Sequence, residues 1–353
     1  MTQPSVHVVV PGPLEQRTGG YLYDARMVHG LRARGWDVVV HNLAGRFPDA
    51  DAIARDALAS TLMHLPDASR VLIDGLAMGG LPEPVRAHGD RLRVLGLVHH
   101  PLADETGLTE AERTRFTASE RASLEPCTGV LVTSPYTATR LADFGVPAER
   151  VRAVPPGTEP AEPAHGPPSG EPPRLLCVAT VTRRKGHDIL IDALDRVRDL
   201  EWACVCAGSL DRDDDWVREV RGQVDAAELG ERIDFVGEHD SAALDAMYAG
   251  SSVFVLASHY EGYGMALAEA LARGIPVVST TGGAIPFTVP ADAGILVPPD
   301  DAAAFARGLR SALDPTTRSA LADAARRHAE QLPDWDASID AFERAILELT
   351  PEG

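Results

Sequence analysis

The sequence has few cysteines, with Cys127, Cys177, Cys204 and Cys206 the only four among 353 residues. A chain of this length cannot be held together by so few thiols, so a disulfide framework is excluded as the basis of the fold. Cys204 and Cys206 alternate within the apolar run W-A-C-V-C-A, which predicts that they share the buried face of one strand. No histidine or second cysteine pair accompanies them at ligand spacing, so we expect no metal site there.

Long apolar segments and basic residues are also scarce. No run of about 18 apolar residues is present that could span a bilayer, and the N-terminus lacks the charged and apolar regions of a signal peptide. The 33 Lys and Arg residues are outnumbered by 52 Asp and Glu, which gives a net charge of −19. This charge disfavours nucleic acid and anionic membranes as partners. We expect a soluble, cytoplasmic monomer or homodimer with no stable membrane association.

Hydrophobic residues, by contrast, make up 44% of the chain, which is ample for a core, and the chain is too long for one α/β layer. Short hydrophobic runs alternate with helical patterns, as is typical of parallel sheets buried on both faces. In the first half we predict strands at 6–10, 37–41, 71–74, 94–98 and 130–133. In the second half we predict strands at 175–181, 202–207, 233–236, 253–256, 276–279 and 295–297.

A proline-rich stretch, PPGTEPAEPAHGPPSGEPP at 155–173, separates the two series of strands. Proline fixes φ and removes backbone donors, so we expect a semi-rigid linker there. The predicted organisation is a doubly wound domain at 1–158, a linker at 159–173, a second doubly wound domain at 174–334 and a C-terminal helix at 335–353. The apolar face of that helix is formed by Trp335, Ile339, Phe342, Ile346 and Leu349.

The most informative segment is FVLASHYEGYGMALAEALARGIPVVS at 254–279, which predicts a strand, a Gly-rich turn, a short helix and a second strand. Glu261 stands ahead of the helix, and Glu269 stands about one turn inside it. The first helical turn is expected to comprise Gly262, Tyr263, Gly264 and Met265. Unpaired amides and the helix dipole there attract phosphate or sugar oxygens, while carboxylates bind hydroxyl groups. This layout suits an anionic, polyhydroxylated ligand.

The same segment resembles the E-x7-E signature of the retaining nucleotide-sugar glycosyltransferases of family four, which have the GT-B fold. The resemblance implies two doubly wound, Rossmann-like α/β domains that face a central cleft, with the last helix crossing back to the first domain. It implies transfer of a hexose, with retained anomeric configuration, from a UDP- or GDP-sugar to a small hydroxylated acceptor in solution. The nucleotide sugar is then a substrate, and no cofactor or metal is expected.

The resemblance also implies roles for individual residues. Glu269 is expected to hold the ribose hydroxyls, and Glu261, with the amides of residues 262–265, to hold the donor sugar. The donor base is expected to lie against strand ends that carry Gly208, Val236 and Gly237. The loop P-G-P-L-E-Q-R-T-G-G-Y places Gly19 and Gly20 before a helix, where the family binds the donor diphosphate or the acceptor.

A cationic cluster follows the first strand of the second domain in V-A-T-V-T-R-R-K-G-H-D. Arg184 and Lys185 are expected to neutralise the diphosphate leaving group. Many family members have an arginine where this chain has Thr180, so Arg183 remains an alternative to Arg184. Asp211 and Asp213–Asp215 form an acidic run before a predicted helix, where carboxylates favour the helix N-terminus; we therefore expect capping and no metal.

Two adjacent histidines end the fourth strand in G-L-V-H-H-P-L. A histidine there can hydrogen-bond a substrate oxygen and, if protonated, stabilise developing charge. By resemblance to the family, His99 is expected near the transferred sugar, with His100 as the alternative.

Three other functions are compatible with parts of this pattern. A GT-B epimerase or hydrolase would consume its nucleotide sugar without an acceptor, and a non-catalytic subunit would bind the donor without turnover. An NAD-dependent dehydrogenase is disfavoured because the sequence has no G-x-G-x-x-G fingerprint after its first strand.

Overall fold

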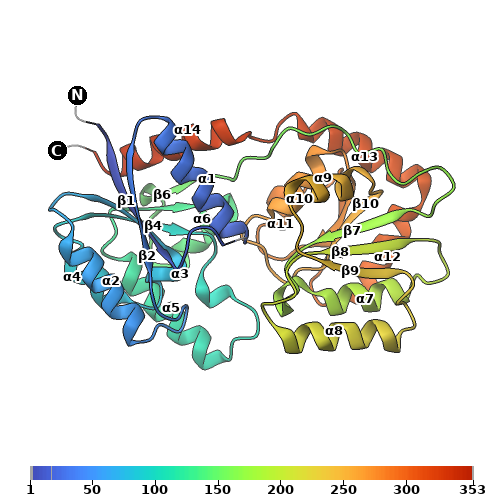
Figure 1. Ribbon diagram of the computed structural model, residues 1–353, viewed down its shortest axis with the longest axis horizontal. Helices are drawn as coiled ribbons and strands as arrows, with labels where there is room; N and C mark the ends of the chain where they lie inside the picture. Colours follow the sequence, from blue (N-terminus) through green and yellow to red (C-terminus); the bar gives the residue numbers. More distant parts are fainter. Residues whose placement is uncertain (1–2, 17, 352–353) are drawn as a thin grey trace. The chain divides into compact units, whose positions relative to one another are not determined.

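The computed structural model describes residues 3–16 and 18–351 and divides into two compact units. Unit 1 comprises residues 1–157 and 333–353, and unit 2 comprises residues 158–332 (Figure 1). Each unit is built around its own parallel six-stranded sheet with flanking helices, as the alternating hydrophobic runs predict. None of the described helices is both long and apolar enough to cross a bilayer.

The sheet of unit 1 has the strand order β2-β1-β3-β4-β5-β6. Its strands are β1 (Ser5–Pro11), β2 (Asp37–Leu43), β3 (Arg70–Asp74), β4 (Arg93–Val98), β5 (Gly129–Val132) and β6 (Val151–Ala153). The five strands predicted from apolar runs are all present, and β6 is an addition. Its three residues, V-R-A, are too short and too mixed to form an apolar run.

The helices of unit 1 are α1 (Gly19–Ala33), α2 (Ala52–His64), α3 (Gly75–Met78), α4 (Pro82–His88), α5 (Glu110–Leu124), α6 (Pro135–Arg140) and α14 (Trp335–Leu349). Helix α5 begins with a capping box, in which the hydroxyl of Thr109 accepts from the amide of Glu112 and the Glu112 carboxylate accepts from the amide of Thr109. Pro135 occupies the first turn of α6, as its fixed φ predicts.

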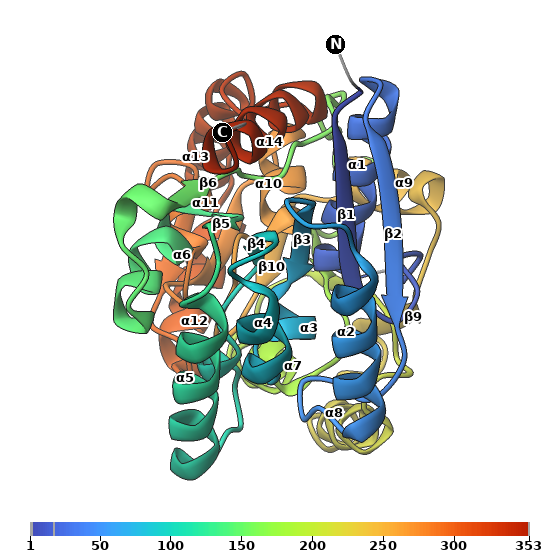
Figure 2. The same ribbon diagram turned by 90° about the vertical axis from the view of Figure 1, so that its left-hand side faces the viewer.

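Successive residues of β1 face opposite sides of the sheet. Val8 and Val10 pack with the buried residues of α1 and α14, whereas Val9 packs with those of α2. Figure 2 shows α2, α4 and α5 of this unit side by side. Both faces of the sheet are therefore covered, which explains why its strands are continuously apolar in sequence.

The sheet of unit 2 has the order β12-β11-β10-β7-β8-β9. Its strands are β7 (Arg174–Val178), β8 (Ala203–Ala207), β9 (Ile233–Gly237), β10 (Val253–Leu256), β11 (Val277–Thr280) and β12 (Gly294–Val297). Its helices are α7 (His187–Asp195), α8 (Asp214–Ala226), α9 (Ser241–Ala249), α10 (Met265–Ala272), α11 (Ile285–Thr288), α12 (Ala302–Leu313) and α13 (Pro315–Ala329). All six predicted strands are present, although β7 ends three residues earlier than expected.

The proline-rich stretch lies against unit 2. Residues 158–173 contain no helix or strand, and backbone hydrogen bonds from residues 164–166 hold them against the rest of unit 2. The amide of Ala164 donates to the carbonyl of Arg273 at 2.8 Å, and that of His165 donates to the carbonyl of Ala249 at 3.0 Å. The segment is thus fastened to the C-terminal ends of α9 and α10.

In each sheet the strand order reverses at one place. The first strand of unit 1, β1, lies between β2 and β3, and the first strand of unit 2, β7, lies between β8 and β10. At such a switch point the loops that leave two adjacent strands diverge to opposite faces and leave a crevice at the carboxyl ends. The topology therefore designates the ends of β1 and β3, and of β7 and β10, as candidate ligand sites.

Helix α14 supplies part of the core of unit 1, although it comes from the far end of the chain. Phe342 is fully buried, and its ring meets that of Tyr23 edge to face at 6.0 Å. We expect Phe342→Ala to lower the free energy of unfolding by about 3–5 kcal/mol, because it leaves a cavity between α14 and α1.

Urea unfolding of the full chain measures this effect. The matched control is Leu347→Ala, on an exposed position of the same helix, which is expected to cost about 0.5 kcal/mol or less. Equal losses in the two variants would show that α14 does not contribute to the core in this way.

Candidate functional site

The loops that follow β7 and β10 are fastened to each other at the switch point of unit 2. The amide of His259 donates to the carbonyl of Arg184 at 2.8 Å. Gly186 has φ +63°, and a Cβ there would lie 2.1 Å from the carbonyl oxygen of Ala257. Only glycine permits this close approach, so the sequence R-R-K-G brings its cations against the loop that carries Glu261.

Glu261 and Lys185 form a buried ion pair between these loops. The Nζ of Lys185 donates to Oε1 of Glu261 at 2.6 Å, and the hydroxyl of Ser258 donates to the same oxygen at 2.6 Å. Arg184 places Nη1 3.6 Å from the other carboxylate oxygen. The Glu261 side chain is 8% exposed and that of Lys185 is 18% exposed. Two cations and one carboxylate therefore form a largely buried cluster.

The electrostatics keep Glu261 ionised. Burial by itself raises the pKa of this carboxyl, but the charges of Lys185 and Arg184 outweigh burial and hold its pKa below the usual value. Burial lowers the pKa of Lys185, and the nearby charge of Glu261 opposes that effect. The cluster carries a net positive charge, which favours an anionic ligand.

The two neighbouring arginines point to different places. Arg184 lies with Lys185 beside Glu261, and its Nη1 donates to the carbonyl of Tyr260 at 2.8 Å. The guanidinium of Arg183 instead stacks 4.3 Å above the ring of Trp216 and lies 3.3 Å from Glu219 on α8. Of the two alternatives, the structure therefore brings Arg184 into the cluster and places Arg183 on the surface of α8.

The helix after Glu261 begins later than the sequence indicates. Gly262, Tyr263 and Gly264 precede α10, and only Met265 belongs to its first turn, so the expectation that all four residues form that turn is wrong. Gly264 has φ +93°, a left-handed conformation that cannot continue into the helix from its N-terminal side. The amides of 262–264 thus line a loop, and the open helix end starts at Met265.

Three helices begin without a side-chain cap among the described helices of eight or more residues. They are α1, α7 and α10, which follow β1, β7 and β10. The others all have a Thr or Asp cap whose side chain accepts from a first-turn amide. In this group Asp213 of the acidic run caps α8, as predicted. Among these longer helices, the three that follow β1, β7 and β10 therefore keep first-turn amides available for an anion, whereas the others do not.

Glu269 lies one turn inside α10 and is held by Tyr248 of α9. The phenol donates to Oε2 of Glu269 at 2.8 Å. The guanidinium of Arg273 stacks 4.6 Å from the Tyr248 ring and donates to the backbone carbonyl of Glu269. Burial raises the pKa of Glu269, with the Tyr248 hydrogen bond acting against this. The hydrogen bond from Tyr248 therefore orients the carboxylate of Glu269 through Oε2.

The residues expected around a base lie at the carboxyl ends of β8 and β9. Val236 and Gly237 end β9, and Gly208 follows β8, where its amide donates to the carbonyl of Gly237 at 2.9 Å. A side chain at Gly208 would collide with the carbonyl of Ala179, whereas the space at Gly237 is open. These positions border the loop that leads from β7 to Lys185.

The switch point of unit 1 holds a second cluster of charges. Nε2 of His99, at the end of β4, lies 3.0 Å from Oδ1 of Asp24 on α1 and 3.6 Å from Oδ2 of Asp74 at the end of β3. Both carboxylates are buried, and Oδ2 of Asp24 has no hydrogen-bond partner among the described residues. The three ligand atoms lie within 4.8 Å of one another, a spacing that could also hold a metal ion.

These carboxylates favour the protonated form of His99 at neutral pH. Burial lowers the pKa of His99, but Asp24 and Asp74 outweigh burial and raise its pKa to about 10. Burial also raises the pKa of Asp24 to about 7, with His99 acting in the opposite direction. An imidazolium can donate a hydrogen bond but cannot accept a proton, so His99 is suited to binding an oxygen and unsuited to general-base catalysis.

The glycine pair Gly19 and Gly20 lies beside this cluster, but inside helix α1 and not before it. Gly19 and Gly20 form the first turn of α1 instead of preceding it, and a Cβ on Gly20 would lie 3.2 Å from the His99 ring. Arg17 of the same loop lies outside the described residues. His100 lies 3.3 Å from Glu105, so His99 is the histidine at the switch point.

Sequence reasoning missed Asp24, Asp74, Ser258 and Tyr248. Asp74 ends the buried run V-L-I-D, and Asp24 stands three and four residues before the buried Met27 and Val28 on the apolar face of α1. An acid on an apolar helical face is a signal that the sequence offered. Ser258 and Tyr248 gave none, because their importance comes from the carboxylates that the fold brings to them.

Comparison with known proteins finds relatives over the whole chain. Residues 159–328 match the family described as Glycosyl transferases group 1. The D-inositol 3-phosphate glycosyltransferase of Xylanimonas cellulosilytica is 27% identical over 95% of this chain and 78% of its own length. The lipopolysaccharide core mannosyltransferase LpsB of Rhizobium meliloti is 30% identical over 42% of this chain and 43% of its own length. The chain thus spans about half the length of the curated relatives that it matches first.

A solved structure shows the same fold. Sucrose-phosphate synthase from Thermosynechococcus elongatus superposes with a TM-score of 0.81 at 24% identity, covering 97% of this chain and 98% of that one. With its two parallel six-stranded sheets and flanking helices, the chain has the GT-B fold.

The pH dependence of stability tests the His99 cluster. Folding raises the pKa of His99 from 6.5 to about 10, so the folded chain holds this proton more tightly than the unfolded chain does. The resulting stabilisation is fully present below pH 6.5 and is lost as the pH rises toward 10. Over that range, urea titrations should show a larger decrease in the free energy of unfolding for the wild type than for His99→Gln. An identical decrease in both would mean that His99 titrates normally.

Proposed function

We propose that this protein is a retaining hexosyltransferase. The premise is that residues 159–328 belong to the group 1 glycosyl transferases. Its donor is a nucleotide sugar, expected to be a UDP- or GDP-sugar, bound by unit 2. Its acceptor is a small hydroxylated molecule, bound mainly by unit 1. No metal takes part in the transfer.

The Lys185–Glu261–Arg184 cluster carries this proposal. It lies at the β7/β10 switch point, where the uncapped ends of α7 and α10 also begin. A donor diphosphate is an anion that suits two cations and free amides, and its sugar carries hydroxyl groups that suit a carboxylate. A cluster that served only stability would not need uncapped helix ends beside it.

Lys185 and Arg184 stabilise the leaving group in this mechanism. As the bond between the anomeric carbon and the diphosphate breaks, negative charge grows on the phosphate oxygens. The cations are already in place, because Glu261 holds Lys185 and the carbonyl of Tyr260 holds Arg184. Little reorganisation is then needed during the reaction.

Glu261 acts as a positioning residue and not as a nucleophile. Oε1 of its carboxylate accepts from Lys185 and Ser258, Arg184 lies 3.6 Å from Oε2, and the two cations lower its pKa. A carboxylate so stabilised is a poor attacking group. Retention therefore follows from attack of the acceptor on the face that the diphosphate leaves.

The proton of the acceptor hydroxyl goes to the departing phosphate. His99 is a candidate base by resemblance, but Asp24 and Asp74 raise its pKa to about 10 and favour its protonated form. It donates a hydrogen bond to a substrate oxygen, while Asp24 and Asp74 hold its ring in place. Glu269, oriented by Tyr248, accepts from the ribose hydroxyls.

The names of relatives indicate which substrates to try first. LpsB is a mannosyltransferase, so nucleotide mannoses belong in the donor panel beside nucleotide glucoses. The D-inositol 3-phosphate glycosyltransferase of Xylanimonas uses a cyclitol phosphate, so cyclitols and their phosphates head the acceptor panel. A cytoplasmic location remains a prediction.

Donor binding tests the cationic cluster. In calorimetric titrations with a panel of nucleotide sugars, Arg184→Ala is expected to weaken binding of the preferred donor by about 30-fold or more, since it removes a charge from the diphosphate site. Arg183→Ala is the matched control, because its side chain lies on α8, and it should leave the affinity within about 3-fold of wild type.

Lys185 needs a variant that keeps the fold, because its removal leaves Glu261 buried without its partner. The double variant Lys185→Met with Glu261→Gln removes both charges of the pair together. We expect it to remain folded and to lose donor binding. Unchanged affinity in this variant and in Arg184→Ala would rule out the proposed donor site.

Glu269 gives a separate test. Glu269→Gln keeps an acceptor for Tyr248 but removes the charge, and should weaken nucleotide-sugar binding by about 10- to 100-fold. It should weaken binding of the free sugar phosphate, which has no ribose, far less. An equal effect on both ligands would contradict a contact with the ribose.

Product analysis decides between transfer and the other functions. NMR of the product with a matched acceptor should show the anomeric configuration of the donor. Inversion would exclude the retaining mechanism. Nucleotide release that is independent of every acceptor would indicate a hydrolase or epimerase, and binding without release would indicate a non-catalytic subunit.

A further inference from the structure

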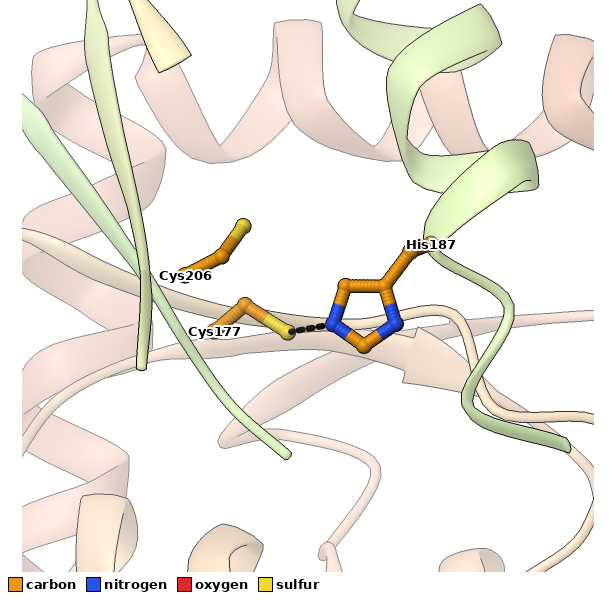
Figure 3. Close-up of side chains that lie close together, drawn as sticks. All are labelled: Cys177, His187 and Cys206. Atoms are coloured by element: carbon orange, nitrogen blue, oxygen red, sulfur yellow. Dashed lines mark hydrogen bonds between the residues drawn. The ribbon is translucent and has the colours of Figure 1, made fainter. Parts of the chain in front are cut away.

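Two cysteines and a histidine meet in the core of unit 2 behind the Lys185 loop. Cys177 of β7 and Cys206 of β8 are direct neighbours across the parallel pair of strands. His187 is the first residue of α7 and extends its ring over that face of the sheet, as Figure 3 shows. The prediction that no histidine accompanies Cys204 and Cys206 was based only on spacing along the chain. The fold brings His187 to them across the βα turn.

The three side chains have the spacing of metal ligands. Sγ of Cys177 lies 3.8 Å from Nε2 of His187, and all three ligand atoms lie within 4.8 Å of one another. With Zn–S bonds of about 2.3 Å and Zn–N bonds of about 2.0–2.1 Å, ligands on one zinc ion stand roughly 3.6–4.0 Å apart. Small rotations of the side chains are enough to reach that geometry.

The polar atoms of His187 are poorly satisfied in the absence of an ion. The residue is 1% exposed, Nδ1 has no hydrogen-bond partner among the described residues, and Nε2 faces only a thiol, a weak hydrogen-bonding group. Burying an imidazole in this way costs free energy that a leucine or phenylalanine would not cost. A bond from Nε2 to a metal would offset that cost.

We propose that Cys177, His187 and Cys206 bind one zinc ion in the interior of unit 2. Two thiols each release a proton to solvent and bind as thiolates, and the neutral imidazole binds through Nε2. The resulting complex has a net charge of zero, which suits a site where all three residues are at most 3% exposed. Soft thiolate ligands favour Zn²⁺ over Mg²⁺ or Ca²⁺.

Cys204 is buried two residues before Cys206 on the same strand, but its sulfur does not belong to the group of three ligand atoms that lie within 4.8 Å of one another. Structural zinc sites have four ligands, so Cys204 would have to move toward the ion to supply the fourth. Because the site is enclosed, the ion enters while the chain folds and acts in stability. It is distinct from the metal-free transfer proposed above and does not depend on it.

Metal analysis of the full-length protein tests this proposal directly. Protein produced in zinc-supplemented cells and purified without chelator should contain about one zinc per chain by mass spectrometry. Cys206→Ser and His187→Gln should each reduce the content to below about 0.2 per chain. The matched control is Cys127→Ser, which removes a buried free cysteine of unit 1 and should retain the zinc.

Cobalt provides a readout that needs no variant. Protein produced in cobalt-supplemented medium should show the intense near-ultraviolet absorption of thiolate-to-cobalt charge transfer, together with the visible bands of a tetrahedral ion. Wild-type protein with no zinc and no such absorption would overturn the proposal. Zinc content that is unchanged in both Cys206→Ser and His187→Gln would overturn it as well, by placing the ion elsewhere.

Discussion

The buried ion pair between Lys185 and Glu261 is the interaction on which the candidate site of unit 2 depends. It joins two loops that are 76 residues apart in sequence and that leave adjacent strands at the point where the strand order reverses. Breaking such a pair on one side leaves a charge without a partner in the interior, which costs several kcal/mol. The same pair holds an ammonium group ready for an anion. Stability and function therefore rest on one contact.

Unit 1 also has a buried cluster of charged side chains at its switch point, but with the opposite arrangement of charges. At its own switch point an imidazolium lies between two buried carboxylates, and the first turn of an uncapped helix approaches the ring through Gly20. Unit 2 holds a carboxylate between two cations, so it attracts anions. Unit 1 holds His99 between two carboxylates, which favour its protonated form and hold its ring in position. This difference in charge is consistent with the proposal that unit 2 binds the anionic donor and unit 1 binds the acceptor.

The N-termini of the helices that begin beside these charge clusters lack side-chain caps. Among the described helices of eight or more residues, Thr18, Gly186 or Gly264 precedes the three that follow β1, β7 and β10 without capping them, and side chains cap the others. A missing cap costs about 1 kcal/mol of helix stability. Its recurrence after β1, β7 and β10 is most simply explained if a ligand supplies the missing acceptor.

The sequence by itself determined the α/β class, eleven of the twelve described strands and the loops after β7 and β10, because apolar periodicity, glycines and charge are local signals. The resemblance of the segment 254–279 to a known family added Glu261, Glu269, Lys185, His99 and one of two arginines as candidates. The sequence did not determine β6, the start of α10 at Met265, or which arginine joins the cluster. It also missed Asp24, Asp74, Tyr248 and the meeting of Cys177, His187 and Cys206. These depend on strand neighbours and side-chain directions that only tertiary packing decides, since residues distant in sequence become partners when parallel strands are placed side by side.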